Sequence, residues 1–134
     1  MTKSEKLSKD WWKENASGVP RLITGIPGPK SKVMHANTAK YIKGLSSQVK
    51  LFPVCFEEGS GITLTDVDGN KFLDFSSGIY VASLGHCHPK VSEAVAYWAK
   101  KLMNVHDFST PVKEKLMEKM ASVLPGKLNA IQLY

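Results

Sequence analysis

The chain has 134 residues, 43% hydrophobic and 22% charged, so it is long enough to bury one core and too short for two ordinary domains. Its net charge is +6, but Arg21 is the single arginine among 18 basic residues, and the lysines are scattered along the whole length. Because nucleic-acid readers favour arginine clusters interleaved with aromatic residues, this composition favours a solvated lysine-rich surface. A small basic nucleic-acid-binding protein remains an alternative.

No segment of the sequence has the character of an export signal or a membrane span. Residues 1–15 are charged throughout, and no stretch approaches the length of apolar sequence that crosses a bilayer. The sequence therefore predicts a cytoplasmic chain with no membrane partner. Cys55 and Cys87 lie far apart without C-x-x-C spacing, which predicts neither a disulfide framework nor a redox motif.

The N-terminal part is predicted to be an arm and linker over residues 1–26. Trp11 and Trp12 stand among charges in a short amphipathic helix, and a Gly/Pro-rich linker follows. Two tryptophans on a charged arm must be buried against something, either the body of this protein or a second copy of it. A further helix is expected from Ser31 to Ile42.

The middle of the chain predicts three short strands in a meander over residues 53–75. Residues 59–61 are expected to form the first turn, and Leu64 lies on the opposite face from its threonine neighbours. Asp68 and Gly69 supply the tight turn that a second hairpin requires.

The last third of the chain is predicted to be helical. Pro89 begins a helix whose apolar spacing runs to Leu102, and Thr110 begins a second helix that ends before residues 125–126. The apolar run at residues 130–134 predicts the start of a buried strand.

A strand at residues 130–134 needs neighbours on both edges, and a further alternating β and α unit is its natural continuation. The sequence therefore predicts a fragment of a larger α/β protein or one chain of a split protein. The alternative is a free-standing binding or oligomerisation module that pairs through the exposed edge.

The Gly-His-Cys-His-Pro segment at residues 85–89 raises the question of a metal site or a catalytic dyad. Zinc needs three or four ligands, and no other histidine, cysteine or aspartate has a helpful spacing. Adjacent cysteine and histidine side chains rarely reach each other's reactive atoms. The favoured interpretation is structural, with His86 or His88 as a polar cap for the helix that Pro89 begins.

The segment from Pro53 to Val91, preceded by Gly-Pro-Lys-Ser at residues 28–31, resembles the N-terminal region of class III, ω-amino-acid-type aminotransferases that use pyridoxal phosphate. The pattern G-x-x-L-x-D-x-D-G-x-x-x-x-D-F with G-H-x-H-P at this separation is specific, and the similarity extends over residues 27–134. The resemblance implies an α/β fold class, the N-terminal segment of a fold type I transferase. Its parts would be N-terminal helices, a three-stranded antiparallel meander, two helices and the start of the large-domain sheet, near a homodimer interface.

The resemblance also implies what residues 1–134 lack. Family members continue, after the segment that matches residues 131–134, into a loop that holds the cofactor phosphate. They also supply an aromatic residue that stacks on the pyridine ring, an aspartate that pairs with its nitrogen, and the aldimine lysine, none of which has a match here. We therefore predict no catalytic, cofactor-binding or metal-binding residue. Pyridoxal phosphate is expected in the full-length enzyme, while the isolated chain neither holds it tightly nor transaminates.

The predicted substrate-binding residues are Ile79, Gly78 and Val49. In the family, the position two residues after the small pair Ser76-Ser77 faces the substrate pocket, and here it is Ile79. Ornithine-type members carry a tyrosine at the position of Ile79 and another near Val49. With an aliphatic residue at position 79, this sequence resembles the 4-aminobutyrate-type enzymes instead. The implied reaction transfers an ω-amino group to a 2-oxo acid such as 2-oxoglutarate by ping-pong kinetics. The alternative is that Ile79 and Val49 are core residues.

Overall fold

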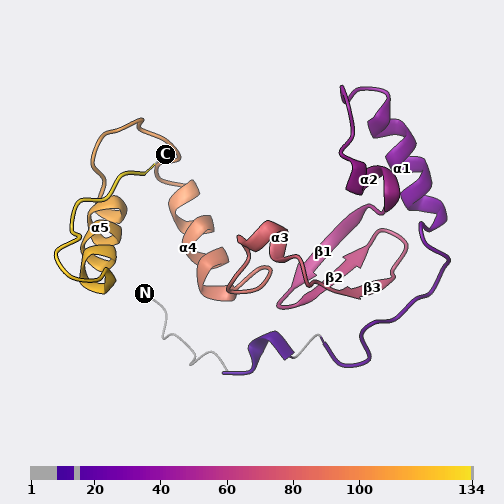
Figure 1. Cartoon of the computed structure of the whole chain (residues 1–134), viewed down its shortest axis with the longest axis horizontal. Coiled ribbons are helices and arrows are strands. Elements are labelled where there is room, and N and C mark those ends of the chain that lie inside the picture. The colour runs from indigo at the N-terminus through magenta and orange to yellow at the C-terminus, as the bar shows by residue number, and fades with distance from the viewer. Residues whose placement is uncertain (1–8, 14–15, 134) are drawn as a thin grey trace. The chain divides into compact units, whose positions relative to one another are not determined.

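The computed structural model describes residues 9–13 and 16–133, and the chain divides into two compact units, residues 1–95 and 96–134. The first unit contains a three-stranded sheet of order β1-β2-β3 (Figure 1). Its strands are β1 (Phe56–Ser60), β2 (Thr63–Asp66) and β3 (Lys71–Leu73), and both pairings are antiparallel. The meander predicted over residues 53–75 is confirmed.

The first turn of the meander lies one or two residues later than predicted. Gly59 and Ser60 belong to β1, and the turn falls at Gly61 and Ile62. Gly61 has a φ of 56°, which an L side chain adopts only with strain, so the glycine at this position fixes the turn.

The two faces of the sheet differ in chemistry. The Phe72 ring meets the rings of Phe52 and Phe56 edge to face, at centroid distances of 5.9 and 5.7 Å. Leu64 pairs with Phe72 and so shares this aromatic face, as its spacing predicts, while Thr65 pairs with Lys71 on the polar face.

The helices that the sequence predicted are present, with shifted ends. They are α1 (Pro29–Ala39), α4 (Pro89–Ala99) and α5 (Pro111–Val123). Two short elements, α2 (Ser47–Leu51) and α3 (Ser77–Tyr80), were not predicted. Each has a single turn, which is too short to leave an apolar periodicity in the sequence.

The centre of the first unit is polar. No hydrophobic side chain is buried in the described part of the chain, and the fully buried residues are Ser31, Asp66 and Asn70. The expectation of one hydrophobic core is therefore wrong for the residues that the structure describes. A meander and short helices present apolar faces that only further packing layers could cover.

Asp66 and Asn70 close the loop between β2 and β3. One carboxylate oxygen of Asp66 accepts hydrogen bonds from the Asp68 and Asn70 amides, at 3.0 and 2.8 Å, and the other accepts from the Asn70 side chain at 2.8 Å. The Asp68-Gly69 turn is confirmed, since Gly69 has a φ of 86° and donates to the Asp66 carbonyl. A buried carboxylate is thereby fully hydrogen-bonded.

The same loop anchors the linker that precedes α1. The side-chain oxygen of Asn70 accepts hydrogen bonds from the Ile23 and Thr24 amides, at 2.7 and 2.9 Å. Arg21 exchanges two backbone hydrogen bonds with Lys71, so the linker pairs with the free edge of β3. The linker is thus joined to the sheet both by the Asn70 side chain and by paired backbone groups.

Asp68 positions the first turn of α1. Its carboxylate accepts hydrogen bonds from the Lys30 and Ser31 amides, at 2.8 and 2.9 Å, and so satisfies donors that a helix leaves open at its N-terminus. A Cβ on Gly28 would lie 2.2 Å from the Asp68 side chain, so only glycine fits there. Desolvation raises the pKa of Asp68, but the Ser31 and Lys30 hydrogen bonds outweigh it and the pKa is lowered.

The described part of the N-terminal arm contacts the first turn of the meander and the residue before α4. The predicted amphipathic helix of residues 1–15 is a 3-10 helix at Trp11–Lys13, and the rest of that prediction falls mostly outside the described residues. The Trp11 ring meets the His88 ring edge to face at 4.9 Å, and the Trp12 backbone lies against Gly61. The body of the same chain therefore contacts this tryptophan-bearing segment.

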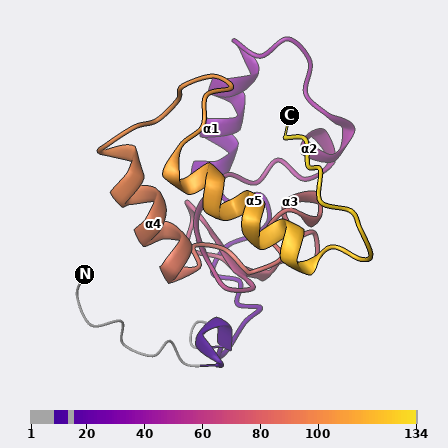
Figure 2. The same cartoon turned by 90° about the vertical axis from the view of Figure 1, so that its left-hand side faces the viewer.

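The main element of the second unit is α5, which Figure 2 shows from the side. The Thr110 hydroxyl accepts a hydrogen bond from the Lys113 amide at 3.1 Å, which confirms the predicted helix start. The strand predicted at residues 130–134 is not formed over its described residues, 130–133. A strand needs a partner for its backbone groups, and none pairs with these residues in the structure. In the described part of the chain, no helix is long and apolar enough to span a bilayer.

Replacing Asn70 with alanine removes the side chain that joins the linker to the loop. We expect the free energy of unfolding to fall by about 1–3 kcal/mol, because the part-buried amides of residues 23 and 24 lose their acceptor and the buried Asp66 carboxylate loses a donor. Urea titration followed by circular dichroism measures the change. Asn129→Ala, at an exposed position, is the matched control and should change it by less than about 0.5 kcal/mol; equal effects would contradict the anchoring role.

Candidate substrate-binding turn

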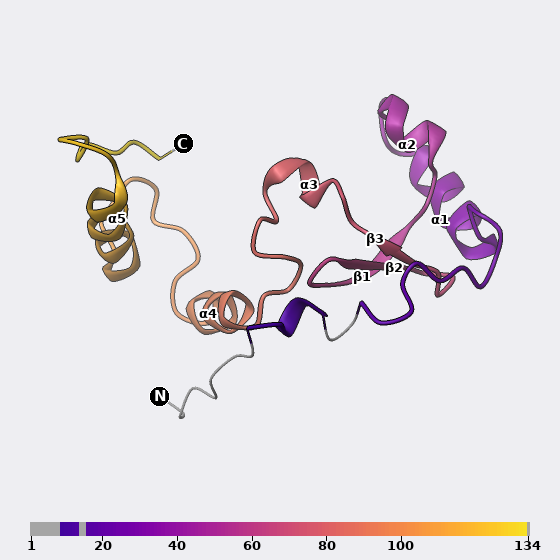
Figure 3. The same ribbon diagram turned by 60° about the horizontal axis from the view of Figure 1, so that its bottom comes forward.

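The α3 element is a left-handed turn. Ser77, Gly78, Ile79 and Tyr80 have φ values of 48°, 59°, 60° and 67°. Figure 3 shows α3 on a loop that projects between β3 and α4. Two of the three predicted substrate-binding residues, Gly78 and Ile79, therefore lie on one unusual turn.

This backbone conformation is strained. Left-handed geometry costs roughly 1–2 kcal/mol for each non-glycine residue, because Cβ approaches the following carbonyl. Ile79 is β-branched, which makes its φ of 60° a genuine outlier. Strained turns of this kind are concentrated at ligand and active sites, which makes α3 a candidate functional element.

Asp74 holds the start of the turn. One of its carboxylate oxygens accepts hydrogen bonds from the Ser76 and Ser77 amides, at 2.8 and 3.0 Å. The Ser76 hydroxyl in turn accepts from the Ile79 amide at 3.4 Å, and the Ser76 carbonyl accepts from the Tyr80 amide. The carboxylate therefore orders the backbone two and three residues beyond it.

His86 bonds the second oxygen of Asp74. The distance from Nε2 of His86 to this oxygen is 2.6 Å, and the side chain of Asp74 is only 7% exposed. The sequence suggested His86 as a cap for α4, but its ring reaches back to Asp74. It is the His88 carbonyl that accepts the first α4 amides, from Val91 and Ser92.

The pKa of Asp74 reflects these contacts. Desolvation by burial raises the pKa, but the hydrogen bond from His86 and those from the Ser76 and Ser77 amides outweigh it, so the pKa lies below its usual value. The carboxylate is accordingly ionised at neutral pH and is a strong acceptor for all three donors.

Apolar side chains on and beside the turn are open to solvent. Ile79 is 73% exposed, and Phe75, Tyr80 and Val81 are 92%, 84% and 83% exposed. Ile79 is therefore not a core residue of the described chain. Exposed apolar side chains gathered on one loop are typical of a ligand or protein contact.

Val49 lies elsewhere. It belongs to α2, which Figures 1 and 3 show beside α1, while α3 lies between β3 and α4. Its side chain is 40% exposed. The structure thus brings Gly78 and Ile79 together but does not bring Val49 to them within this chain.

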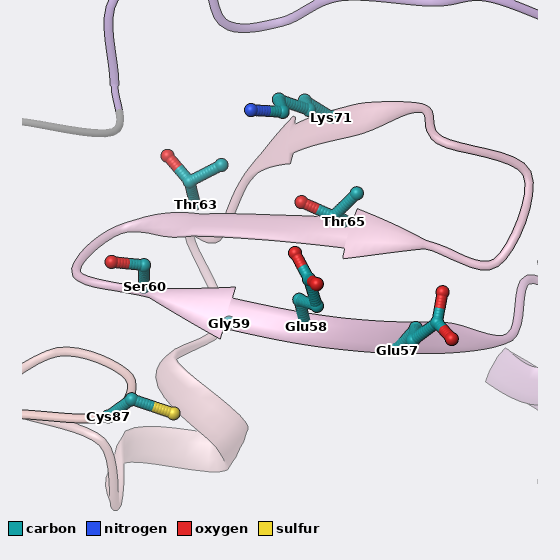
Figure 4. A pocket seen from close by; sticks show the side chains of 8 residues that line it. All are labelled: Glu57, Glu58, Gly59, Ser60, Thr63, Thr65, Lys71 and Cys87. Atoms are coloured by element: carbon teal, nitrogen blue, oxygen red, sulfur yellow. The ribbon is translucent and has the colours of Figure 1, made fainter.

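Two cavities adjoin this region within the first unit. An apolar one of about 450 Å³ lies between the segment after α3 and the start of α4, lined among others by Val81, Leu84 and Val91. A polar one of about 400 Å³ lies on the sheet (Figure 4). Its lining residues are Glu57, Glu58, Gly59, Ser60, Thr63, Thr65, Lys71 and Cys87.

A β-bulge explains the two neighbouring carboxylates of the polar cavity. The register of β1 shifts between Phe56 and Glu58, so Glu57 and Glu58 both reach the same cavity although adjacent strand residues normally face opposite sides. Across the described residues, no group of three or more His, Cys, Asp or Glu side chains could hold a metal ion.

Comparison with known proteins identifies the family. Residues 45–133 match the family Aminotransferase class-III. The chain is a member of this family. The acetylornithine aminotransferase of Methanocaldococcus jannaschii is 40% identical over 72 residues, which cover 53% of this chain and 18% of that protein. The alanine/serine racemase of Pyrococcus horikoshii is 40% identical over 76 residues, or 57% of this chain and 16% of that protein.

Solved structures agree with the sequence matches. A transaminase from the marine bacterium Virgibacillus has a TM-score of 0.62 and 32% identity, covering 74% of this chain and 24% of that one. The ornithine aminotransferase of Toxoplasma gondii has a TM-score of 0.60 and 28% identity, covering 69% and 21%. The class III aminotransferase fold, fold type I, is confirmed. The chain spans about a fifth of the length of these relatives, and the matches favour neither alternative function.

Class III aminotransferases depend on pyridoxal phosphate, but the described residues do not fit this cofactor. A lysine that forms a covalent link to it must be enclosed, and none of the lysines whose side chains the structure describes is buried. Lys71 lines the polar cavity, but Glu57 and Glu58 share that cavity and would repel the cofactor phosphate. The residues that the structure describes therefore do not by themselves form a pocket for this cofactor.

Acid should weaken the first unit through Asp74. Folding lowers the pKa of Asp74. The ionised Asp74 carboxylate therefore contributes its full stabilisation above the usual aspartate pKa of about 3.9, and this stabilisation is lost as pH falls through the lower pKa of the folded state. We expect Asp74→Asn to lower the free energy of unfolding by about 1.5–3 kcal/mol at pH 7 and to flatten its decline below pH 4. Denaturation at a series of pH values measures this. Asp107→Asn, in an exposed aspartate and histidine pair, should leave both quantities unchanged.

Glycine at position 79 should relieve strain. Relief of strain is worth about 1–2 kcal/mol and the entropic cost of glycine is about 0.5–1 kcal/mol, so Ile79→Gly should raise the free energy of unfolding by up to about 1.5 kcal/mol. Val81→Gly is the matched control, since Val81 is also exposed but has a φ of −96°, and it should be destabilising. Equal losses for the two variants in urea titration would contradict the left-handed assignment.

Proposed function

We propose that this chain is the N-terminal portion of a pyridoxal-phosphate-dependent aminotransferase that moves an ω-amino group from a 4-aminobutyrate-like donor to a 2-oxo acid such as 2-oxoglutarate. In this proposal residues 1–26 are the arm and linker, and residues 27–134 are the N-terminal part of the aminotransferase fold. The isolated chain is inactive, because its described residues hold no enclosed lysine for the cofactor.

The observation that carries the substrate proposal is the side chain of Ile79. It is 73% exposed on a strained turn, so it is available for contact with a ligand and not needed to fill a core. An aliphatic side chain offers no hydrogen bond, which favours a donor whose middle carbons are apolar. Gly78 leaves room beside it for the donor, and Val49 is proposed as a second apolar contact.

The names of the relatives do not fix the donor. They include acetylornithine aminotransferases and a diaminobutyrate and 2-oxoglutarate aminotransferase of Rhizobium meliloti, so donors differ among proteins that match this chain. The diaminobutyrate enzyme, 36% identical over 84 residues, supports 2-oxoglutarate as the acceptor. We expect single pocket residues, such as the one at position 79, to determine which donor each of these similar proteins prefers.

A homodimer in the cytoplasm is part of the same proposal. The exposed apolar side chains of Phe75, Tyr80 and Val81 beside Ile79 would be covered by a second copy, which supports a dimer interface next to the substrate site. Amino and 2-oxo acids are the expected small-molecule partners, with neither nucleic acid nor membrane among them.

A chimeric enzyme tests the substrate assignment. The segment of M. jannaschii acetylornithine aminotransferase that matches this chain is replaced by the corresponding residues of this chain, and kcat/KM is measured for 4-aminobutyrate and acetylornithine. We expect the chimera to shift the ratio at least about tenfold towards 4-aminobutyrate, and Ile79→Tyr to reverse that shift.

Glu93→Tyr, at an exposed position of α4, is the control for added bulk outside the turn and should leave the ratio unchanged. The proposal fails if Ile79→Tyr leaves the donor preference where it was. The 134-residue chain without the rest of the enzyme should show no turnover of either donor.

A further inference from the structure

We propose that Asp74 and His86 are positioning residues for Ile79: the Asp74 carboxylate, oriented by His86, holds residues 76–80 in the left-handed turn that presents Ile79. The inference rests on the proposed function only for the role that it gives to the Ile79 side chain. The geometry that it describes can be tested without any substrate.

The turn needs a restraint from outside itself. Ser77, Ile79 and Tyr80 all have positive φ values, which their side chains oppose. Within the turn, the Tyr80 and Val81 amides donate to the Ser76 and Ser77 carbonyls at 3.1 and 3.0 Å, but these bonds join residues of the turn only to one another. The bonds that tie its start to the rest of the unit, at 2.8 and 3.0 Å, are those to the Asp74 carboxylate.

The two oxygens of Asp74 have separate partners. One accepts from the Ser76 and Ser77 amides and the other bonds Nε2 of His86 at 2.6 Å. A carboxylate that is bound at both oxygens cannot rotate without breaking a hydrogen bond. His86 therefore fixes the plane of the carboxylate, and the plane fixes where the two amides point.

His86 is itself fixed by the sheet. Its backbone amide and carbonyl exchange hydrogen bonds with Gly61 at 2.8 and 2.9 Å. Its side chain lies so close to β1 that a Cβ on Gly59 would be 2.9 Å from the His86 Cβ. The contacts therefore run from the first turn of the meander, through His86 and Asp74, to the residues that carry Ile79.

This arrangement accounts for the first histidine of the Gly-His-Cys-His-Pro motif. Helix capping does not use the His86 ring, and the ring has no part in a metal cluster of described residues. Its hydrogen bond joins residues 12 positions apart in the sequence. Removal of the ring should release the turn while the paired strands remain.

Nuclear magnetic resonance of the full 134-residue chain tests the inference directly. At a φ near 60° the amide and α protons of one residue are close together, so their intraresidue cross-peak is strong. We expect strong peaks for Ile79 and Tyr80 in the unsubstituted chain. In His86→Leu they should fall to the intensity seen for α4 residues, while the Thr65 and Lys71 amide signals keep their positions.

His86→Gln is the rescue variant, because the glutamine amide nitrogen can reach the same Asp74 oxygen. We expect it to restore the strong cross-peaks. His106→Leu, at an exposed histidine that also has a positive φ, is the matched control and should leave the Ile79 signals unchanged. Strong peaks that persist in His86→Leu, or their absence from the unsubstituted chain, would overturn the inference.

A measurement on the unsubstituted chain decides the question if His86→Leu does not fold. Scalar couplings through the hydrogen bonds should join the Ser76 and Ser77 amide nitrogens to the side-chain carboxyl carbon of Asp74. Their absence, while couplings between the paired strands are seen, would overturn the inference.

The chimeric enzyme separates this inference from the proposed function. There, His86→Leu should raise the KM for 4-aminobutyrate about tenfold with little change in kcat, and His86→Gln should restore it. If Ile79→Tyr leaves donor preference unchanged while the cross-peaks behave as expected, the substrate assignment fails and the positioning role stands. If the cross-peaks fail, the positioning role fails whatever the donor.

Discussion

Carboxylates that accept backbone N–H groups are the interaction on which the first unit of this chain depends. Asp66 closes the loop between β2 and β3, Asp68 receives the first amides of α1, and Asp74 receives the first amides of the α3 turn. Among the described residues no apolar side chain is buried, so these charge-assisted hydrogen bonds take the place that a hydrophobic core has in most domains.

Such a scaffold holds short elements in place without a thick packing layer. Asn70 ties the linker to the sheet by side-chain hydrogen bonds, and glycines at positions 28, 59 and 61 allow backbone and side chains to approach closely. The outcome is a polar frame with apolar side chains facing outward around α3. In a class III aminotransferase, that arrangement suits an element that other parts of the enzyme must cover.

The strained α3 turn depends on the same kind of carboxylate hydrogen bond. A run of positive φ values at Ser77, Ile79 and Tyr80 persists only where neighbouring contacts determine the backbone. Asp74 provides those contacts, and its lowered pKa keeps the acceptor ionised near neutral pH. Family membership gives the chemical setting, and the role proposed for the side chain at position 79 depends on the turn that Asp74 holds.

By itself the sequence determined those features whose signals are local. Asp68 with Gly69 fixes a tight turn, Thr110 with Pro111 begins a helix, and the alternation around Leu64 sets the strand faces, because each depends on neighbours in the chain. The specific spacing of the aspartate and histidine motifs was also enough to predict the family, which the comparison confirmed.

Only the tertiary structure decided the roles that depend on distant partners. The hydrogen bond between His86 and Asp74 requires the first turn of the meander to bring residues 12 apart together, and no periodicity encodes it. The left-handed backbone of Ile79 contradicts the preference of a β-branched residue, so local propensity predicts the opposite. Residues 130–133 have the composition of a strand but form none, because strand structure is fixed by a pairing partner and not by the sequence of one segment.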